Sequence, residues 1–585
     1  MSFKDNNVIL IRGFALVFFL SFFIFSFSLK NIYCRISSAK RGGELILASV
    51  SDPKSFNPIV AKEVSTTAVT GLMFEGLTKT NGKTLEVEPN LAVSWDKDEE
   101  GRVWVFHLRH NIFWSDGEPF TADDVVFTFN RLIYNPDIPT SARDIFTIEG
   151  KKLRVEKVDE WTVRVTLPVK FAPFLRSMGT AILPKHILEK SVNEGKFSYT
   201  WGLDSNPKDI VGMGPFKIEK YLPGERVVLT RNPYYWQKDS QGNRLPYLDK
   251  VIFVIVQNPD VALLQFQEGK LDFYSLRGED YAVLKPQEKK GNFTVFNTGP
   301  AFGTNFLVFN QNTSVNHRTG KHYISEKKLG WFTNPKFRKA AAFAVDRQSI
   351  IDIVMNGLGF SQYSSMSPSA GYFYNPDVQK YEYNIKKAKA LLKEIGIYDR
   401  DNNGLAEDGK GNRIEFNLFT NANSTVRIKI ANIIRKDLER LGFKVNFVPL
   451  EFNQLVSKVD STYDWDAVMI GLTGGIEPHF GSNVWKSSGH LHIWYPCQKK
   501  PATEWEAEID SIFDRAVQEL DRKKRKALYD KWQMIVSEKL PLIYTVLPAN
   551  IFAVRNKFGN LDPTSYGGAF YNIEKIYIKP KYFVK

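Results

Sequence analysis

The feature that most constrains the fold of this chain is an alternation of strand-like and helix-like stretches, which continues through most of its 585 residues. Strands are predicted at residues 103–108 and 162–167, and residues 251–256 form a continuous apolar run, typical of a strand covered on both faces. This pattern indicates an α/β protein. Because no internal repeat and no long low-complexity linker interrupts it, we expect domains that are interleaved in the sequence.

Capping signals predict where several helices begin and end. Thr121 and Asp124 have the spacing of a capping box. Asn334-Pro335 places a capping residue before a proline at the first helical position. A further helix is predicted over residues 384–395, with Gly396 as its left-handed terminating residue.

An export signal is predicted at the N-terminus. Lys4 and Arg12 precede residues 14–29, an uncharged run that contains seven phenylalanines. This run is shorter than the roughly 20 apolar residues of a membrane span and suits the apolar core of a signal peptide. We therefore assign residues 1–41 to a signal peptide or an N-terminal anchor. The protein is expected in the periplasm or on the outer face of the cytoplasmic membrane.

The fate of this segment is left open by the sequence. Cys34 lies where a bacterial lipoprotein signal places its lipidated cysteine, but Tyr33 stands where signal peptidases require a small residue. Cleavage near residues 37–39 is an alternative, as is an uncleaved anchor. Cys497 is the only other cysteine, so no structural disulfide is expected.

The positive charge of the chain does not predict a nucleic-acid partner. The net charge is +14, but the basic residues are scattered among acids along the whole length. The densest basic run, residues 522–526, is flanked by Asp521 and Asp530 and is interpreted as the solvated face of a helix.

Two near-motifs are interpreted as turns. Residues 76–84 resemble a phosphate-binding loop, but five residues separate the two glycines where four are required, and Asn81-Gly82 predicts a hairpin turn. Residues 399–404 match the first half of a calcium loop, but Lys410 occupies the position of the bidentate glutamate. We therefore expect a surface turn here.

No metal, cofactor or catalytic centre is predicted. His479, His490 and His492 lack a carboxylate or cysteine at a spacing that indicates zinc, so structural or ligand-contacting roles are favoured. The sequence contains no Gly-x-Ser-x-Gly elbow and no His-Glu-x-x-His helix. The chain is therefore not expected to be an enzyme.

Many short segments, taken in order, resemble one family. They are residues 42–45, 72–77, 89–95, 106–109, 114–125, 212–216, 231–236 and 337–347. Together they are similar to the family 5 extracellular solute-binding proteins, which include oligopeptide and dipeptide receptors. The strings themselves form turns, caps and strand ends, so they identify the scaffold rather than the ligand contacts.

The resemblance implies a type II periplasmic-binding-protein fold, with two lobes joined by hinges and a small extra α/β domain. The first lobe would take residues 42–77, 206–299 and 546–585, the extra domain 78–205, and the second lobe 300–545. The crossings near residues 300 and 546 would be the hinges.

The resemblance also implies which segments bind the ligand. In peptide-binding relatives the peptide backbone pairs with strand-like segments of both lobes. Carried over, the candidate residues are Glu63, Val64 and Ser65 in the first lobe, and Phe302, Gly303, Thr304, Gly471, Leu472, Thr473, Gly474, Gly475 and Glu477 in the second. The aromatic residues Trp485 and Trp494 are added as candidate stacking surfaces.

This sequence departs from the peptide-receptor pattern at one point. Such receptors carry an aspartate that holds the peptide's α-amine, whereas residues 474–476 contain no acid, and Leu472 replaces a usual tryptophan. The expected function is the substrate-binding component of an ABC importer that delivers oligopeptides to a membrane permease, acting as a monomer. Because the region is rich in aromatic rings, an oligosaccharide receptor is the alternative. A less favoured alternative is an exported sensor or hydrolase on the same scaffold.

Overall fold

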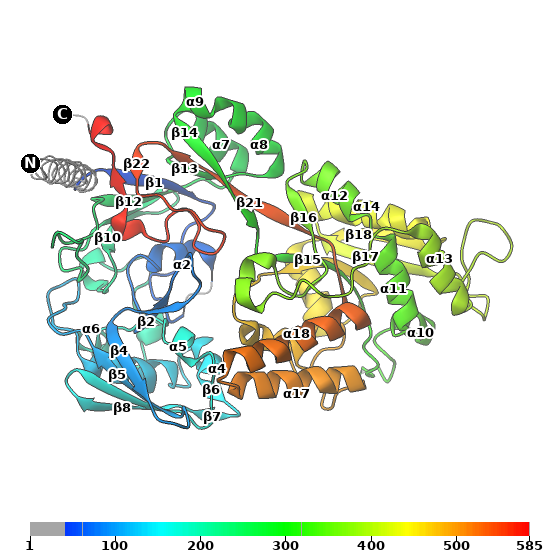
Figure 1. The fold of residues 1–585 in the computed structure, drawn as a ribbon, viewed down its shortest axis with the longest axis horizontal. Coiled ribbons are helices and arrows are strands. Elements are labelled where there is room, and N and C mark those ends of the chain that lie inside the picture. The colour runs from blue at the N-terminus through cyan, green and yellow to red at the C-terminus, as the bar shows by residue number, and fades with distance from the viewer. Residues whose placement is uncertain (1–40, 61–62, 317–318, 584–585) are drawn as a thin grey trace, which may run out of the picture.

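The computed structural model describes residues 41–60, 63–316 and 319–583. Two halves lie side by side, and the long strand β21 (Val546–Arg555) runs from one to the other (Figure 1). The predicted signal segment and Cys34 lie outside the described residues. Within those residues, no helix has the length and apolar character that a bilayer crossing requires.

The first lobe is built on a four-stranded sheet with the order β1-β12-β11-β10. Its strands are β1 (Glu44–Ser49), β10 (Phe216–Leu222), β11 (Arg226–Arg231) and β12 (Lys250–Ile255). β12 contains most of the predicted 251–256 strand and pairs with β1 and β11, one on each side. The C-terminal residues Ile576 and Ile578 belong to the same core, so distant parts of the chain form this lobe together.

A second sheet of the first lobe receives strand β21. There β21 lies between β13 (Phe273–Ser275) and β14 (Phe293–Pro300). At its other end, β21 pairs with β16 (Gly359–Ser361), which belongs to the opposite half of the molecule. β21 therefore connects the two halves by main-chain hydrogen bonds as well as by the chain itself.

The extra domain is built on an antiparallel sheet with the order β4-β5-β9-β8. Its strands are β4 (Ala92–Lys97), β5 (Val103–Leu108), β8 (Arg154–Asp159) and β9 (Thr162–Thr166), which confirms both predicted strands. Helix α3 (Ala122–Phe127) begins with the predicted capping box of Thr121 and Asp124. β2 (Thr78–Thr80) and β3 (Val87–Pro89) form a hairpin, so the near phosphate-loop motif is a turn, as predicted.

The second lobe contains a five-stranded sheet with the order β18-β17-β19-β15-β20. Its strands are β15 (Thr304–Phe309), β17 (Glu415–Asn421), β18 (Lys444–Leu450), β19 (Ala467–Leu472) and β20 (Leu542–Tyr544). One face is covered by α11 (Pro335–Ala344), whose cap is Asn334, and by α14 (Thr425–Glu439). α13 (Ile385–Glu394) is capped by Asn384 and followed by Gly396 at φ 77°, which confirms that predicted helix.

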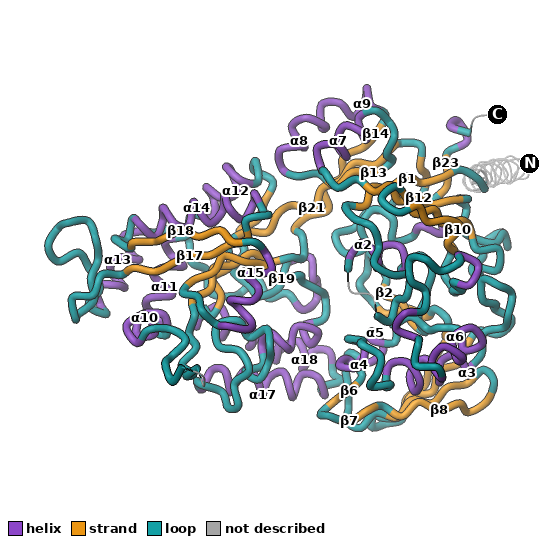
Figure 2. The backbone as a smooth tube through the Cα atoms, turned by 180° about the vertical axis from the view of Figure 1, so that it is seen from behind, coloured by secondary structure: helices purple, strands orange, loops and turns teal. Residues whose placement is uncertain are grey.

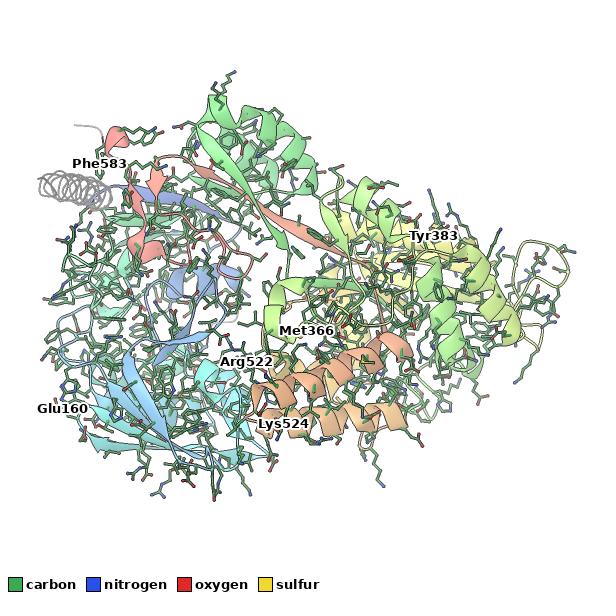
Figure 3. All side chains as sticks on the ribbon, in the orientation of Figure 1. Glu160, Met366, Tyr383, Arg522, Lys524 and Phe583 are labelled. Carbon is green, nitrogen blue, oxygen red and sulfur yellow. The ribbon has the colours of Figure 1, made fainter. Side chains whose placement is uncertain are left out.

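The other face of this sheet packs against a helical hairpin of α17 (Glu504–Gln518) and α18 (Arg522–Lys539). The beginning of α18 lies beside α4 (Ala142–Ile145) and the extra domain in both views (Figures 1 and 2). Arg522 pairs with Glu86 of the extra domain at 2.8 Å. Figure 3 shows Arg522 and Met366 on the side of the second lobe that faces the other half.

The interpretation of residues 522–526 as a solvated helix face is wrong for Arg525. Lys523 and Lys524 are exposed, as predicted, but Arg525 is buried and pairs with Glu477. The physical reason is the helical repeat, since a run of five residues extends past one full turn and one of its members must point inward.

Candidate ligand-binding cleft

Two adjoining cavities lie where the lobes meet. The first, of about 320 Å³, is lined only by residues of the second lobe, and we call it the inner chamber. The second, of about 620 Å³, is lined by the first lobe, the extra domain and the second lobe, and we call it the interdomain chamber. The two chambers share four lining residues, Gly474, Gly475, Glu477 and Phe480, so they adjoin along this segment.

The inner chamber is formed mainly by backbone and rings. Eight of the predicted site residues line it: Phe302, Thr304, Leu472, Thr473, Gly474, Gly475, Glu477 and Trp485. They come together because β15 and β19 are neighbours, with Thr304 opposite Leu472. The sequence analysis missed residues 365–367, Trp532 and Tyr544, which complete the wall. These belong to distant segments, and no local pattern marks them.

The interdomain chamber was missed almost entirely. Gly71, Phe74 and Glu75 line it from the first lobe, and Lys79 and Arg176 from the extra domain. Glu75 lies in a string that the sequence analysis assigned to the scaffold alone. Arg176 lies within the short helix α5 (Phe174–Ser177), which no recognisable motif marks, so only the packing of three parts of the chain reveals its position.

The first-lobe segment at residues 63–65 differs from the prediction. We expected an extended strand, but Glu63 is the N-cap of helix α2 (Val64–Thr70). Val64 is 83% exposed and Ser65 donates a hydrogen bond to the Asp52 carbonyl. None of the three lines either chamber. The Glu63 carbonyl accepts the amides of Thr66 and Thr67 inside the helix, so this segment does not present the strand edge that would pair with an extended peptide.

Three glycines of the predicted loop have different roles. A Cβ built on Gly471 would lie 2.3 Å from the Thr304 carbonyl oxygen, and one on Gly474 would lie 2.0 Å from that of Phe302. These positions therefore need glycine so that two strands can approach. At Gly475 no atom lies within 4 Å of such a Cβ, and the residue is exposed. Gly303 and Gly471 flank the inner chamber without lining it.

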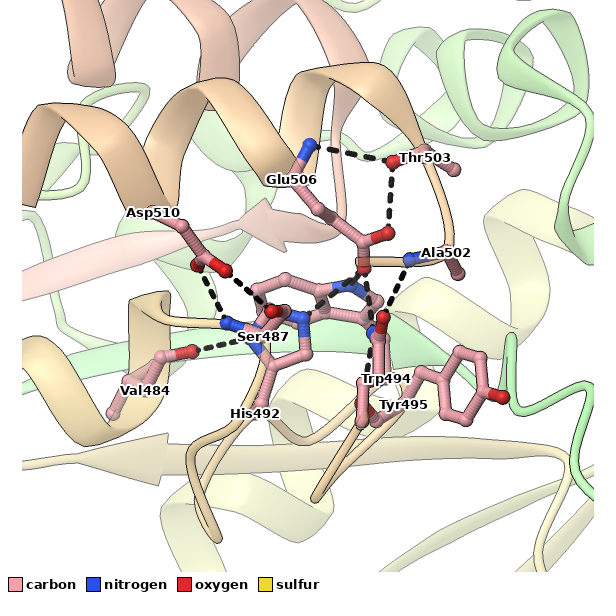
Figure 4. A network of polar contacts seen from close by, with 10 residues as sticks. Val484, Ser487, His492, Trp494, Tyr495, Ala502, Thr503, Glu506 and Asp510 are labelled. Atoms are coloured by element: carbon pink, nitrogen blue, oxygen red, sulfur yellow. Dashed lines mark hydrogen bonds and ion pairs between the residues drawn. The ribbon is translucent and has the colours of Figure 1, made fainter. Parts of the chain in front are cut away.

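Trp494 does not lie in the cleft, contrary to our expectation. It is 1% exposed and belongs to a core cluster with Trp485 and Trp532. Its indole Nε1 donates to Glu506 at 3.0 Å, inside the network of Figure 4. Burial alone would raise the pKa of Glu506, but hydrogen bonds from His492, Gln498 and Thr503 lower it below the usual value. A tryptophan held in this way packs the lobe rather than a ligand.

His479, His490 and His492 make contacts with different groups and do not form one cluster. His492 is fully buried and contacts the Val484 carbonyl and Glu506, while His490 contacts the sulfur of Cys497 at 3.1 Å. His479 packs edge-on against Phe171 of the extra domain, with ring centroids 5.5 Å apart. Burial lowers its pKa from 6.5 to about 4, with Arg525 and Lys486 acting in the same direction.

The calcium-like segment is a surface turn, as predicted. The Asp399 carboxylate accepts hydrogen bonds from the amides of Asn403 and Gly404 at 3.1 and 2.9 Å. Asp399, Asp401 and Glu407 bring carboxylate oxygens within 4.8 Å of one another.

Two charged residues fix the segment between the chambers. Glu477 is 6% exposed and forms an ion pair with Arg525 of α18. Its carboxylate also caps the short helix at residues 478–481 through the His479 amide at 3.2 Å. Glu477 therefore acts both as a helix cap and as a member of a buried ion pair.

A second acid, Glu75, lies in the wall of the interdomain chamber. One carboxylate oxygen accepts from the Tyr235 hydroxyl at 2.9 Å and the other from the Trp236 indole at 2.7 Å. Burial raises the pKa of Glu75 from 4.5 to about 7, although both hydrogen bonds and the nearby Lys79 oppose this shift. Near neutral pH this group therefore carries only part of a negative charge.

Comparison with known proteins agrees with this architecture. The model of the family described as bacterial extracellular solute-binding proteins, family 5 (middle), matches residues 86–491. A probable ABC transporter-binding protein of Deinococcus radiodurans is 30% identical over 526 residues, which cover 86% of each chain.

Two further relatives carry more specific names. The oligopeptide-binding protein AppA of Bacillus subtilis is 29% identical over 92% of each chain. Its structure in complex with a nonapeptide aligns with a TM-score of 0.70, covering 92% of this chain and 99% of that chain. The periplasmic alpha-galactoside-binding protein of Rhizobium meliloti is 26% identical and covers 88% of this chain and 77% of the relative.

Proposed function

The chain belongs to the family 5 bacterial extracellular solute-binding proteins, and we propose that it captures oligopeptides in its cleft and delivers them to the permease of an ABC importer. The family consists of solute-binding proteins rather than enzymes. The observation that carries the proposal is the pair of adjoining chambers, since a cavity walled by three parts of the chain can change its volume when those parts move.

The proposed binding mode uses the segment between the chambers. Residues 472–475 line the cavity, and in the proposed mode their backbone groups hydrogen-bond to an extended peptide without reading its side chains. Water in the remaining volume would bridge to variable side chains. Closure requires the ligand to prefer the closed arrangement, and moving a 1:99 equilibrium to 99:1 takes roughly 5.5 kcal/mol of differential binding.

The proposed movement takes place at the two chain crossings. One joins β14 to β15, and the other joins β20 to β21. Contacts away from these crossings would break on opening. The clearest is the hydrogen bond from the Ala172 amide of the extra domain to the Val517 carbonyl of the second lobe, at 2.7 Å. We further propose that the protein is exported and anchored or released through residues 1–41.

An oligosaccharide is the second candidate ligand. Phe480, Trp485 and Trp532 line the inner chamber, and aromatic faces beside polar groups suit sugar rings. The alpha-galactoside-binding relative supports this alternative.

Native mass spectrometry of the protein purified without residues 1–41 tests the proposal. Bound masses that fragment as peptides would support a peptide receptor. A ladder of hexose masses would contradict it and favour the oligosaccharide alternative. If the protein is purified empty, thermal-shift measurements with pentapeptide pools and neutral oligosaccharides decide between the two.

A further inference from the structure

The charged groups of the interdomain chamber are unevenly matched. Two cations, Lys79 and Arg176, and two acids, Glu75 and Glu477, line its wall. If the acids neutralised the cations, the chamber would carry no net preference for the charge of a ligand. The contacts of the four side chains show that they do not.

The negative charge of Glu477 is already neutralised by Arg525 of helix α18. Its carboxylate pairs with Arg525, and both side chains are at least 90% buried. Breaking a buried ion pair leaves an uncompensated charge, which is strongly destabilising. Glu477 is therefore committed to Arg525 and cannot also serve as the counter-ion of a ligand ammonium group.

Glu75 is also a poor counter-ion. Each of its carboxylate oxygens already accepts a hydrogen bond from Tyr235 or Trp236. Its pKa of about 7 means that its charge is partly lost at neutral pH. An ammonium group at this position would meet a weak and already occupied acceptor.

Arg176 is fixed in place, and two acids, Glu477 and Glu86, act on it only from beyond ion-pair distance, each raising its pKa. Its two terminal nitrogens donate to the Thr80 hydroxyl at 2.9 Å and to the Leu85 carbonyl at 2.8 Å, and both acceptors are neutral. Among the described residues, neither Arg176 nor Lys79 takes part in an ion pair within 4.0 Å. Burial lowers the pKa of Arg176, yet a guanidinium remains protonated at physiological pH.

We infer that the interdomain chamber is a subsite for a carboxylate of the ligand, held by Arg176 with Lys79 nearby, and that the described residues lining this chamber form no dedicated site for an α-ammonium group. This inference rests on the proposed function. A partly desolvated guanidinium without a counter-ion gains most from a charge-assisted hydrogen bond to a carboxylate. The carboxylate can be the C-terminus of a peptide, an acidic side chain or a sugar acid, which share the same chemistry.

Matched ligand pools test the inference by calorimetric titration. Three pools of the pentapeptide Ala-X-X-X-Ala, with neutral residues at X, carry a free C-terminus, a C-terminal amide, or an N-terminal acetyl group with a free C-terminus. We expect amidation to weaken binding at least tenfold and acetylation to weaken it less than threefold. In Arg176→Met the free-acid and amide pools should bind alike.

Arg164→Met is the matched control, because Arg164 is exposed on β9 of the same domain. It should keep the wild-type preference for the free acid. Thermal unfolding of each variant separates lost recognition from lost folding, and Arg176→Lys should restore part of the preference if charge is what matters. Loss of binding on acetylation, with amidation harmless, would overturn the inference.

Two other outcomes separate the inference from the proposed function. If all three peptide pools bind equally, the carboxylate subsite is refuted while peptide capture stands. If no peptide pool binds, peptide capture fails, and trigalacturonate is compared with its methyl ester. Preference for the free sugar acid that disappears in Arg176→Met supports the subsite, and equal binding or no binding of the pair refutes it.

Discussion

The two chambers of the cleft are built in different ways. The inner chamber belongs to one lobe and is walled by backbone, rings and small side chains. The interdomain chamber needs three parts of the chain, and its wall contains two cations and two acids among glycines and apolar side chains. The first therefore persists whatever the lobes do, while the second is complete only when they are together. A ligand that fills both would link shape recognition in one lobe to the closure of the whole protein.

The largest effect is expected at the ion pair between the chambers. Arg525→Met leaves Glu477 buried without a partner, so we expect the free energy of unfolding to fall by about 3–5 kcal/mol. Chemical denaturation measures this change. The double variant Arg525→Met with Glu477→Leu should recover much of the loss, because both charges are then removed. If the single variant unfolds as the wild type does, the pair does not hold this segment.

A smaller effect on stability is expected at Trp494, which packs in the core of the second lobe and does not line the inner chamber. Trp494→Phe removes the hydrogen bond to Glu506 and leaves a gap in the core, at a cost of about 1–3 kcal/mol. Ligand affinity should stay within twofold, measured by calorimetry with the free-acid peptide pool. Trp485→Phe is the comparison, because Trp485 lines the inner chamber. A loss of affinity in Trp494→Phe alone would place Trp494 at the ligand after all.

Gly475→Val should act on binding with little effect on folding. The position is exposed in the structure, and a Cβ added there meets no atom within 4 Å, so the new side chain enters the space of both chambers. We expect affinity to fall about tenfold, which corresponds to roughly 1.4 kcal/mol. Thermal unfolding without ligand should be unchanged, in contrast to Gly474→Val, which meets the Phe302 carbonyl. Unaltered affinity in Gly475→Val would show that the ligand does not pass this segment.

The last contrast concerns the pH dependence of stability and the contact between His479 and Phe171. Because burial lowers the pKa of His479 to about 4, its contribution to stability is full above about pH 6.5 and is lost as the pH falls toward 4. Glu75 has the opposite sign, since its raised pKa favours the folded state below about pH 4.5 and this contribution is lost as the pH rises toward 7. The two effects overlap and partly cancel in the wild-type protein.

The His479→Gln variant resolves the two contributions. Subtracting its stability from that of the wild type at each pH removes the effect of Glu75, which both proteins share. The difference should grow in favour of the wild type between pH 4 and 6.5, measured by chemical denaturation. A difference that does not vary with pH would show that His479 titrates normally.

The fold was largely predictable from the sequence, because its signals are local. The Thr121 capping box, the Asn334-Pro335 helix start and the 251–256 apolar run depend on neighbouring residues, and each was correct. The family strings are of the same kind, since turns and caps need particular residues at fixed spacing. The segment at residues 63–65 was wrong because its assignment came from the position of a strand in relatives, and here Glu63 caps a helix.

The candidate site was predictable where one lobe builds it. Residues 302–304 and 471–477 lie at the ends of paired strands, so identifying those strands was enough to bring them together. The two predicted aromatic residues have different environments. Trp485 lines the inner chamber and Trp494 packs in the core, although only nine positions separate them. Composition cannot distinguish a ring that faces a ligand from one that faces a helix.

The sequence by itself determined the α/β class, the family scaffold and the strand ends that form the inner chamber. Only the tertiary structure decided that Arg525 neutralises Glu477, that Glu75 accepts hydrogen bonds from Tyr235 and Trp236, and that Arg176 lines the interdomain chamber with no ion-pair partner within 4.0 Å among the described residues. The physical reason is that the charge and exposure of these side chains depend on groups up to several hundred positions away. Local signals fix how each segment folds, whereas electrostatics in a cleft depends on which segments meet there.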